Sequence, residues 1–213
     1  MWVEQIWRYP VKSMAGEPLE VAELELGGIV GDRVVHVQSA DGRVVTSRRQ
    51  PRLLGHRAAL GEDGEPRIDG RPWASADVAA DVRRAAGEGT RLVRYDGPDR
   101  FDILPLLVAT DGALQVFGRD VRRLRPNLVI GGVAGLEERN WQERRLRIGP
   151  VLIQLADLRD RCVMTTFDPD TLEQDPSVLR DIVQRFDGAL ALNASVLSPG
   201  EIAVGARVEL VDT

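Results

Sequence analysis

The sequence of 213 residues contains one cysteine and two histidines. A single cysteine excludes a disulfide within the chain and is typical of a reducing compartment. His36 and His56 with one cysteine do not provide the ligand spacing of a zinc site. No apolar run approaches the roughly 18 residues of a membrane span, and the first residues do not have the composition of a signal peptide. The sequence therefore predicts a cytoplasmic protein without a membrane segment.

The sequence is also poor in lysine. Lysine and arginine together number 28, and Lys12 is the one lysine among them. Lysine and arginine replace one another freely on a solvated surface, so this ammonium is either required at its position or present by chance. The net charge of −5 argues against a general nucleic-acid-binding protein. With 43% hydrophobic residues, the chain is able to bury the core of an ordinary globular protein.

Short apolar stretches separated by turn residues predict a mainly β protein. An Asp-Gly turn indicates a hairpin of residues 33–38 with 44–45, and residues 57–60 and 66–69 are expected to form a second hairpin. Further strands are predicted at residues 3–9, 19–26, 91–95, 104–108, 128–130, 151–155, 190–196 and 202–211, the last interrupted by a turn at Gly205.

Only a few segments predict helices. Residues 75–86 have Ser75 as the N-cap, and residues 176–186 have Asp175 as the N-cap followed by proline. Residues 109–114 are a candidate for a third helix start. Many short strands with few helices favour a β-barrel over a fold of alternating strands and helices.

A cluster of breaker residues, Asp-Gly-Pro-Asp at 96–99, indicates a boundary within the chain. We therefore expect two parts, residues 1–97 and residues 98–213, each built mainly from strands.

The lone cysteine is the first candidate for a functional side chain. Cys162 follows Arg161 directly, and Thr165 and Thr166 come soon after it. A thiolate is a good nucleophile and a good ligand for a soft metal, and a neighbouring arginine stabilises its charge. The threonine hydroxyls are candidate donors to a polar ligand. The alternative is that Cys162 is a small buried hydrophobic residue.

Cationic and hydroxyl side chains recur in predicted turns. Lys12 and Ser13 follow the first strand, and an ammonium beside a hydroxyl suits a phosphate. Arg33, the segment 46–53 and the segment 122–127 add guanidinium groups in other turns. The concentration of arginine in the predicted turns of an acidic chain indicates an anion pocket. The alternative is a solvated face, where arginine-rich turns are also common.

In their order along the chain, these motifs resemble the MOSC family, named for the carboxy-terminal domain of molybdenum-cofactor sulfurase. The resemblance is strongest to two-part members with an N-terminal β-barrel, such as the mitochondrial amidoxime reducing component and its bacterial relatives. It rests on Tyr-Pro-Val-Lys-Ser at 9–13, Gly-Asp-Arg at 31–33, Thr-Ser-Arg-Arg-Gln-Pro-Arg-Leu at 46–53, Asp102 with Pro-Leu-Leu at 105–107, Arg-Leu-Arg-Pro-Asn at 123–127, residues 137–141 with 146–149, and residues 161–169.

The resemblance implies a MOSC-type β-barrel, an N-terminal β-barrel-like region and a molybdenum cofactor, whose dithiolene holds the metal and whose phosphate needs cationic partners. It implies Cys162 as the ligand of molybdenum. The positions that it implies for cofactor binding are Lys12 and Ser13 at the phosphate, Arg33, Ser47 and Arg48 in the basic pocket, Arg125 and Asn127 at the pterin, and Arg161, Thr165 and Thr166 beside the metal.

Some residues depart from the family pattern. Ala113 stands where serine is frequent, Ala206 replaces the closing aspartate, and an aspartate separates Phe186 from Gly188. These differences concern pocket geometry more than the fold. With one cysteine the chain cannot hold an iron–sulfur cluster alone, and Lys12 lies in the wrong motif to bind pyridoxal phosphate.

Three functions remain open at this stage. The first is reduction of small N-hydroxylated compounds, with electrons supplied by a separate protein. The second is a module that carries the cofactor, or sulfur as a Cys162 persulfide. The third is a MOSC-like fold that has lost its cofactor. For either of the first two, Lys12 and Cys162 are expected to line one cleft between the two halves of the chain.

Overall fold

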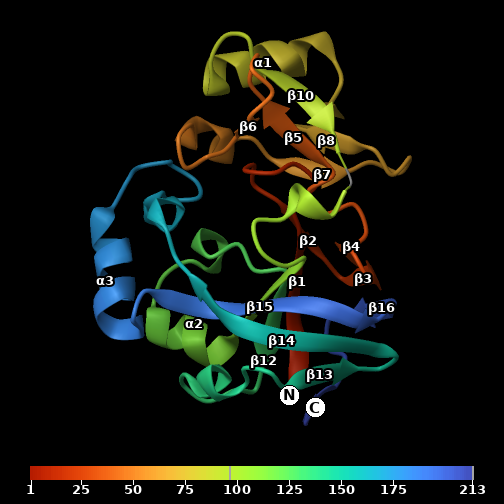
Figure 1. Cartoon of the computed structure of the whole chain (residues 1–213), viewed down its shortest axis with the longest axis vertical. Coiled ribbons are helices and arrows are strands. Elements are labelled where there is room, and N and C mark those ends of the chain that lie inside the picture. Colours follow the sequence, from red (N-terminus) through yellow and green to blue (C-terminus); the bar gives the residue numbers. More distant parts are fainter. Residues whose placement is uncertain (96, 213) are drawn as a thin grey trace.

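A computed structural model describes residues 1–95 and 97–212 of the chain. Strands dominate, and the described residues form three α-helices, so the prediction of a mainly β protein with few helices is confirmed. Figure 1 shows a lower part built on long strands and an upper part of short strands beneath one helix.

The largest sheet has eight strands. Their order is β17 (Val208–Val211), β13 (Arg145–Ile148), β14 (Val151–Asp160), β15 (Ala189–Ser198), β11 (Leu106–Thr110), β12 (Leu128–Gly131), β1 (Trp2–Arg8) and β2 (Glu17–Leu19). All neighbours are antiparallel except β11 and β12, which are parallel. Its buried face carries apolar residues such as Ile6, Ile130 and Ile153, as expected for strands that enclose a core.

The large sheet curls so that its β17 end meets β1, the strand next to the opposite edge. Trp2 forms an isolated antiparallel bridge with Arg207. The backbone nitrogen of Val3 donates to the Ala206 carbonyl at 2.9 Å, and that of Val208 donates to the Met1 carbonyl at 3.0 Å. Within the described residues, β1 and β17 are thus joined by a short bridge and not by a continuous ladder.

The upper part contains two small antiparallel sheets and helix α1 (Ala76–Ala86). Both predicted hairpins are present: Val37 pairs with Val45, and Ala58 pairs with Ile68. The sheets consist of β10 (Arg91–Arg94), β5 (Val35–Gln38) and β6 (Val44–Val45), and of β7 (Ala58–Leu60), β8 (Pro66–Ile68) and β9 (Arg71–Pro72). Their apolar side chains pack with those of α1 in a separate core.

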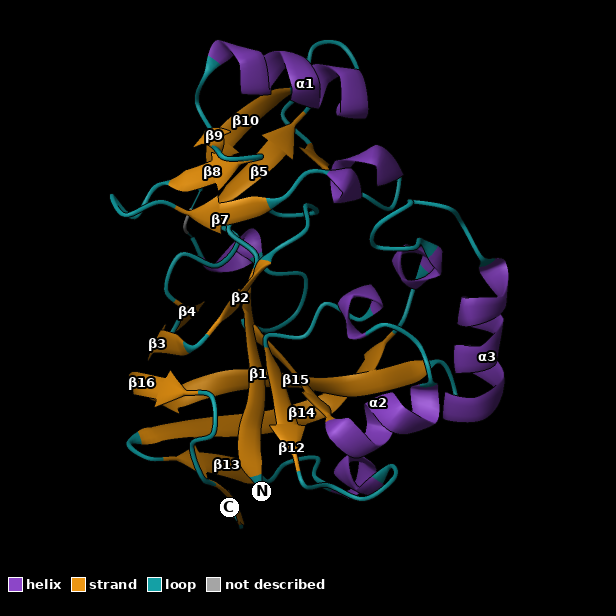
Figure 2. Cartoon of the chain, turned by 180° about the vertical axis from the view of Figure 1, so that it is seen from behind, coloured by secondary structure: helices purple, strands orange, loops and turns teal. Residues whose placement is uncertain are grey.

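The two halves of the chain are interleaved. Strands β1 and β2 come from the first half, yet they extend the large sheet beside β12. A third small sheet joins β3 (Val21–Glu25) and β4 (Gly28–Ile29) to β16 (Gly200–Ala203) from the far end of the chain. In Figure 2, β2 and β4 lie between the upper and lower parts, and β1 continues into the lower part. The division at residue 97 stays a prediction; the breaker cluster behind it includes residue 96, which lies outside the described residues.

The three helices begin where capping side chains are available. Ser75 accepts from the Val78 nitrogen at the start of α1, and Asp175 accepts from the Ser177 nitrogen at the start of α3 (Pro176–Phe186), as predicted. The candidate helix start at 109–114 is also a helix, α2 (Asp111–Phe117), with the Thr110 hydroxyl as its cap. The predicted strand at 19–26 is interrupted, because β2 ends at Leu19 and β3 begins at Val21.

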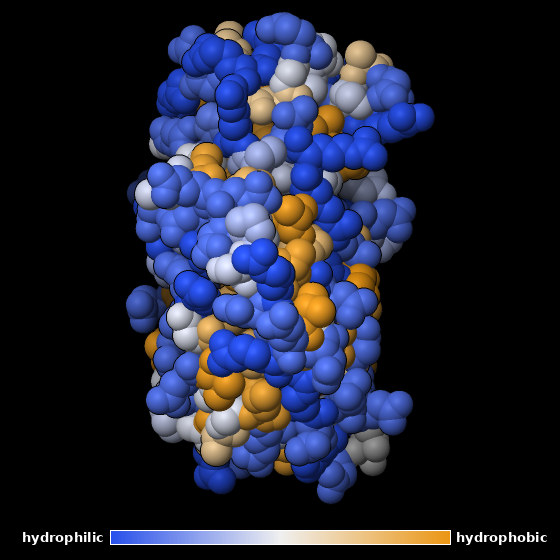
Figure 3. Space-filling model, turned by 90° about the vertical axis from the view of Figure 1, so that its left-hand side faces the viewer, coloured by the Kyte–Doolittle hydropathy of each residue, from blue (hydrophilic) through white to orange (hydrophobic). Residues whose placement is uncertain are grey.

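No helix among residues 1–95 and 97–212 combines the length and the apolar character that crossing a membrane requires. The face shown in Figure 3 is mostly hydrophilic, with apolar residues gathered in small groups. Small apolar groups of this kind are normal on the surface of globular proteins.

The interleaving predicts that the second half will not fold alone. A fragment of residues 98–213 would lose β1 from the side of β12 and β3 from the side of β16, which exposes strand edges and apolar side chains. We expect this fragment to be poorly soluble and free of cofactor, as measured by sedimentation and metal analysis after expression beside the full chain. A soluble fragment that binds cofactor as well as the full chain does would contradict this expectation.

Candidate functional site

A cleft of about 160 Å³ lies where the two halves meet, and Lys12 and Cys162 both line it, as the sequence predicted. Its walls come from both halves of the chain. Nine of the positions that the sequence singled out are among the lining residues: Lys12, Ser13, Arg33, Arg48, Arg125, Asn127, Arg161, Cys162 and Thr165.

The cleft is strongly cationic although the whole chain is acidic. Its described lining contains seven basic side chains and two acidic ones, Asp102 and Asp160. The chain as a whole carries a net charge of −5. Such a concentration of one charge inside a concave site raises the local concentration of ligands of the opposite charge. The arginine-rich turns thus line a concave cleft, and anion binding in that cleft stays a prediction.

The buried carboxylate of Asp32 determines how the cleft is assembled. Asp32 is 0% exposed, and its Oδ1 accepts from the backbone nitrogen of Tyr9 at 2.7 Å. Its Oδ2 accepts from the guanidinium of Arg33 and from Nδ2 of Asn127, the latter at 3.2 Å. The Asn127 Oδ1 in turn accepts from the Leu107 nitrogen at 3.1 Å. One carboxylate therefore connects the end of β1, the turn after β4 and the residue before β12.

The buried ring of Tyr9 lies against two cationic side chains of this region. Its ring centroid is 4.3 Å from the Arg125 guanidinium and 5.1 Å from that of Arg33, within the range of cation–π contacts. The Tyr9 hydroxyl donates to the Pro126 carbonyl at 3.1 Å, and burial raises the pKa of Tyr9 to about 12. The phenol is therefore neutral at physiological pH, and its ring remains available to both arginines.

Three residues of the cleft have a left-handed backbone that L-residues seldom adopt. The φ angles are 71° at Ser13, 56° at Arg33 and 57° at Arg125. Each such residue costs on the order of 1 kcal/mol relative to a right-handed one. At Arg33 a backbone hydrogen bond holds this conformation, since the Arg33 nitrogen donates to the Tyr9 carbonyl at 2.8 Å. Backbone strain of this kind concentrates at functional sites.

Asp102 is the point where three cations of the cleft meet. Its carboxylate lies 2.7 Å from Lys12 Nζ, 3.5 Å from Arg48 and 3.4 Å from Arg159. Burial opposes ionisation, but the hydrogen bond from Lys12 and the charges of all three cations hold the pKa of Asp102 below its usual value. Lys12 also donates to the Arg100 carbonyl at 2.9 Å. The ammonium and two guanidinium groups are thereby held in one place.

Cys162 lies at the start of a short 3-10 turn, Val163–Thr166, and is half-buried. The Thr165 hydroxyl donates to the Cys162 carbonyl at 2.9 Å, which fixes the backbone of the thiol residue. Arg161 donates through Nη2 to the Leu124 carbonyl at 2.6 Å, while its buried Nε has no partner among the described residues. Burial and the charge of Arg159 lower the pKa of Arg161 to about 10, so it remains protonated at neutral pH.

Two of the predicted positions do not reach the cleft. Ser47 is fully buried, and its hydroxyl contacts the Met164 sulfur at 3.4 Å. Thr166 is 2% exposed and donates to the Val163 carbonyl at 2.6 Å. Both hydroxyls are used to hold the turn that carries Cys162. Thr46, the neighbour of Ser47, lines the cleft instead.

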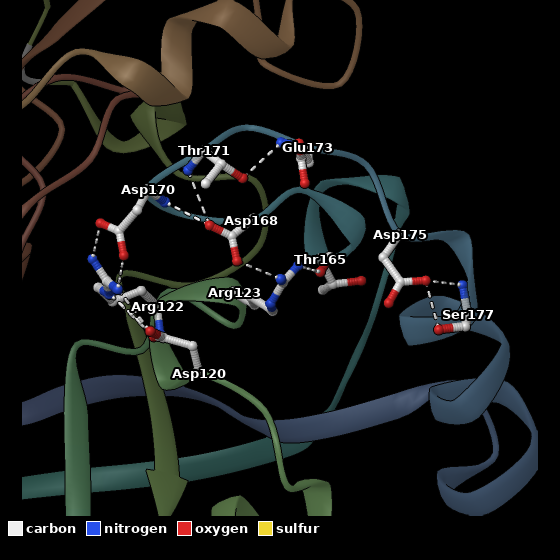
Figure 4. Close-up of polar contacts among 10 residues, drawn as sticks. All are labelled: Asp120, Arg122, Arg123, Thr165, Asp168, Asp170, Thr171, Glu173, Asp175 and Ser177. Atoms are coloured by element: carbon white, nitrogen blue, oxygen red, sulfur yellow. Dashed lines mark hydrogen bonds and ion pairs between the residues drawn. The ribbon is translucent and has the colours of Figure 1, made fainter.

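The turn with Cys162 is also held by arginines from the segment before β12. Arg123 donates to Asp168 at 2.9 Å and to the Thr165 carbonyl at 3.3 Å. Arg122 lies between Asp120 and Asp170 and donates to both. Figure 4 shows these contacts side by side. The segment that contributes Arg125 and the loop that follows Cys162 are therefore tied together.

Arg159 and Asn193 are cleft residues that the sequence did not reveal. Arg159 lies on β14 and contacts Asn193 Oδ1 on β15 at 3.4 Å. The available signal was the spacing between Arg159 and Arg161. Side chains alternate along a strand, so residues two positions apart point to the same face. The predicted strand at 151–155 ended too early to use this signal, since β14 continues to Asp160.

Replacing Asp32 with asparagine tests its structural role. Asp32→Asn removes the negative charge that compensates Arg33. It also replaces one of the two carboxylate oxygens, both of which accept hydrogen bonds, with an NH2 group that donates. Loss of one partner of a buried ion pair is expected to lower the free energy of unfolding by about 3 kcal/mol, measured by urea denaturation. The control is Asp63→Asn, in an exposed pair with Arg67 at 2.8 Å, with an expected loss below about 1 kcal/mol. Equal losses in the two variants would contradict the assignment.

Comparison with known proteins agrees with these motifs. A model of the MOSC N-terminal beta barrel domain matches residues 1–102, and a model of the MOSC domain matches residues 113–209. The chain is 27% identical to mitochondrial amidoxime reducing component 2 of Macaca fascicularis, over 79% of this chain and 67% of that protein. It is 26% identical to mitochondrial amidoxime-reducing component 1 of Homo sapiens, with the same coverage.

A solved structure shows the same fold. The YuaD protein of Bacillus subtilis aligns over 100% of both chains with a TM-score of 0.56 and 13% sequence identity. With both domain models matched in the expected order and the fold shared with a solved structure, the chain belongs to the MOSC family.

Proposed function

We propose that this protein is a molybdenum-cofactor-dependent oxidoreductase that reduces small N-hydroxylated compounds. The observation that carries the proposal is a single cleft with cationic groups around Lys12 and the lone thiol, Cys162, in its lining. Distant similarity to amidoxime reducing components supports the same chemistry. Electrons would come from a separate donor protein.

The groups in the cleft fit the proposed cofactor. A phosphate requires cationic and hydroxyl partners, which Lys12, Ser13 and Arg48 supply from one side of the cleft. Arg125 has no hydrogen bond or ion pair within the described part of the chain, and Arg161 Nε has no partner there. Burial lowers the pKa of Arg125 to about 10 although the charges of Asp32 and Asp102 act against this shift, so the guanidinium stays charged at neutral pH with no carboxylate paired to it among the described residues. An anionic, polar ligand offsets both costs.

When bound, the cofactor would supply a redox-active molybdenum and the dithiolene sulfurs that hold it. The protein would supply one thiolate from Cys162, whose backbone is fixed by Thr165. Asp102 would hold Lys12, Arg48 and Arg159 in place, so that little reorganisation is needed when an anion binds. Asn127 would support the wall near Arg125 from behind, because its buried amide already donates to Asp32 and to the Trp7 carbonyl and accepts from the Leu107 nitrogen.

The half-buried thiol also supports a second candidate, a non-redox module that carries the cofactor or a Cys162 persulfide. The two functions differ in turnover. A reductase converts an N-hydroxylated amidine with a chemical reductant over many cycles, whereas a carrier releases its cargo to an acceptor once per loading.

The cationic end of the cleft gives a prediction for cofactor binding. Lys12→Ala or Arg48→Ala removes a charge-assisted contact worth about 1.5–3 kcal/mol, so cofactor affinity should fall roughly ten- to a hundredfold. Molybdenum occupancy at limiting cofactor measures this effect. The control is Arg43→Ala, whose side chain is 83% exposed in a turn outside the cleft. Unchanged occupancy in both cleft variants would count against the assigned phosphate site.

The thiol gives a separate prediction for activity. Cys162→Ser is nearly isosteric, so the fold should remain, as checked by circular dichroism and thermal unfolding. Because a hydroxyl is a much poorer ligand for a soft metal, reductase activity should fall to that of cofactor-free protein. Thr171→Ser, a conservative change on the same loop, should keep full activity. Wild-type turnover in the Cys162 variant would refute its role as metal ligand.

A further inference from the structure

A second cavity lies beside the cleft and has a different character. Its volume is about 250 Å³, and it shares Arg123, Arg125 and Met164 with the cleft. Neither Lys12 nor Cys162 lines it. The other lining residues are Trp7, Tyr9, Ala15, Gly16, Pro18, Leu54, Arg57, Arg122, Phe167 and Pro169. We propose that this cavity binds a small monocarboxylate with an apolar body the size of an aromatic ring.

Within the described residues, each arginine that lines the cavity, except Arg125, forms an ion pair with a carboxylate. Arg122 is clamped by Asp120 and Asp170, and Arg123 is paired with Asp168 (Figure 4). Arg57 lies 3.8 Å from Asp170 and is 77% exposed, so water and that carboxylate screen it. None of the described lining residues is acidic.

Arg125 is the exception and supplies the recognition group. Its guanidinium is stacked 4.3 Å from the Tyr9 centroid and makes no hydrogen bond or ion pair within the described residues. All five guanidinium donors are therefore available, and a planar fork of donors matches a carboxylate in two parallel bonds. A single guanidinium without a direct partner there, with the carboxylates of Asp32 and Asp102 near enough to act on its charge, favours a monoanion over a dianion such as phosphate.

The remaining walls favour an apolar body attached to that carboxylate. Trp7, Tyr9 and Phe167 provide aromatic surface, and Leu54 provides aliphatic surface. A pocket with apolar walls and one placed charged group is the usual form of a small-molecule site. The wall at Gly16 is closely packed, because a Cβ there would lie 2.2 Å from the Arg8 carbonyl oxygen and 2.5 Å from the Tyr9 ring.

This cavity shares Arg125 with the proposed cofactor site, so it is tested in protein that holds no cofactor. Benzoate is titrated into the apoprotein by calorimetry and by the indole resonances in ¹H–¹⁵N NMR, with Trp7→Phe identifying the Trp7 signal. Benzamide is the neutral analogue of the same shape. We expect benzoate to bind at one site and to shift the Trp7 resonance, with benzamide at least about tenfold weaker.

Variants distinguish the cavity from the cleft. Arg125→Gln removes the charge, and Leu54→Phe fills the cavity without touching the cleft. Both should weaken benzoate binding by about tenfold or more. Arg48→Gln alters only the cleft and should leave binding unchanged. Because Arg125→Gln also alters the contact with Tyr9, Leu54→Phe keeps the test valid if the former variant does not fold.

Three results would overturn the proposal. The first is the absence of benzoate binding at about 10 mM, a concentration at which even a weak specific site would be occupied. The second is equal affinity for benzoate and benzamide, which would show that Arg125 recognises no carboxylate. The third is loss of binding in Arg48→Gln with retention in Leu54→Phe, which would place the anion in the cleft.

Discussion

The buried carboxylate of Asp32 is the interaction on which the rest of the site depends. It receives hydrogen bonds from the backbone of Tyr9, from Arg33 and from Asn127, which belong to three separate parts of the chain. A charge removed from water is tolerated only when it is paired and hydrogen-bonded in this way. The position of each partner is therefore constrained by the other two, and the cleft inherits its shape from that constraint.

The cleft and the second cavity are two consequences of one arrangement of arginines. Acidic neighbours neutralise Arg122 and Arg123 and use them to hold the loop after Cys162. Arg125, stacked on Tyr9 and held in a left-handed conformation, is left with its donors unused. Such a residue costs stability in the free protein, and an anionic ligand on either side of it recovers that cost. A common arginine also means that ligands in the two sites would influence each other's affinity.

Local signals in the sequence were sufficient for much of the fold. The Asp-Gly turn, Ser75 and Asp175 act over a few residues, so the hairpin and the helix starts follow from nearby chemistry. The ordered motifs also placed Lys12 and Cys162 in one cleft. Ser47 and Thr166 support the turn that carries Cys162 and do not line the cleft. This role depends on tertiary packing, which a local sequence pattern does not reveal. Tertiary packing also determines the pairing of β3 with β16 and the place of Arg159 in the cleft.

The interleaved sheets have a consequence for synthesis on the ribosome. Strand β1 emerges early but pairs with β12, and β3 pairs with β16, which is translated near the end of the described chain. These strands therefore wait with unpaired edges while the intervening segments are made, and contacts so distant in sequence slow folding. The upper sheets and α1 close over shorter separations, so we expect them to fold first. Nascent chains of this protein should depend on chaperones until the last strands leave the exit tunnel.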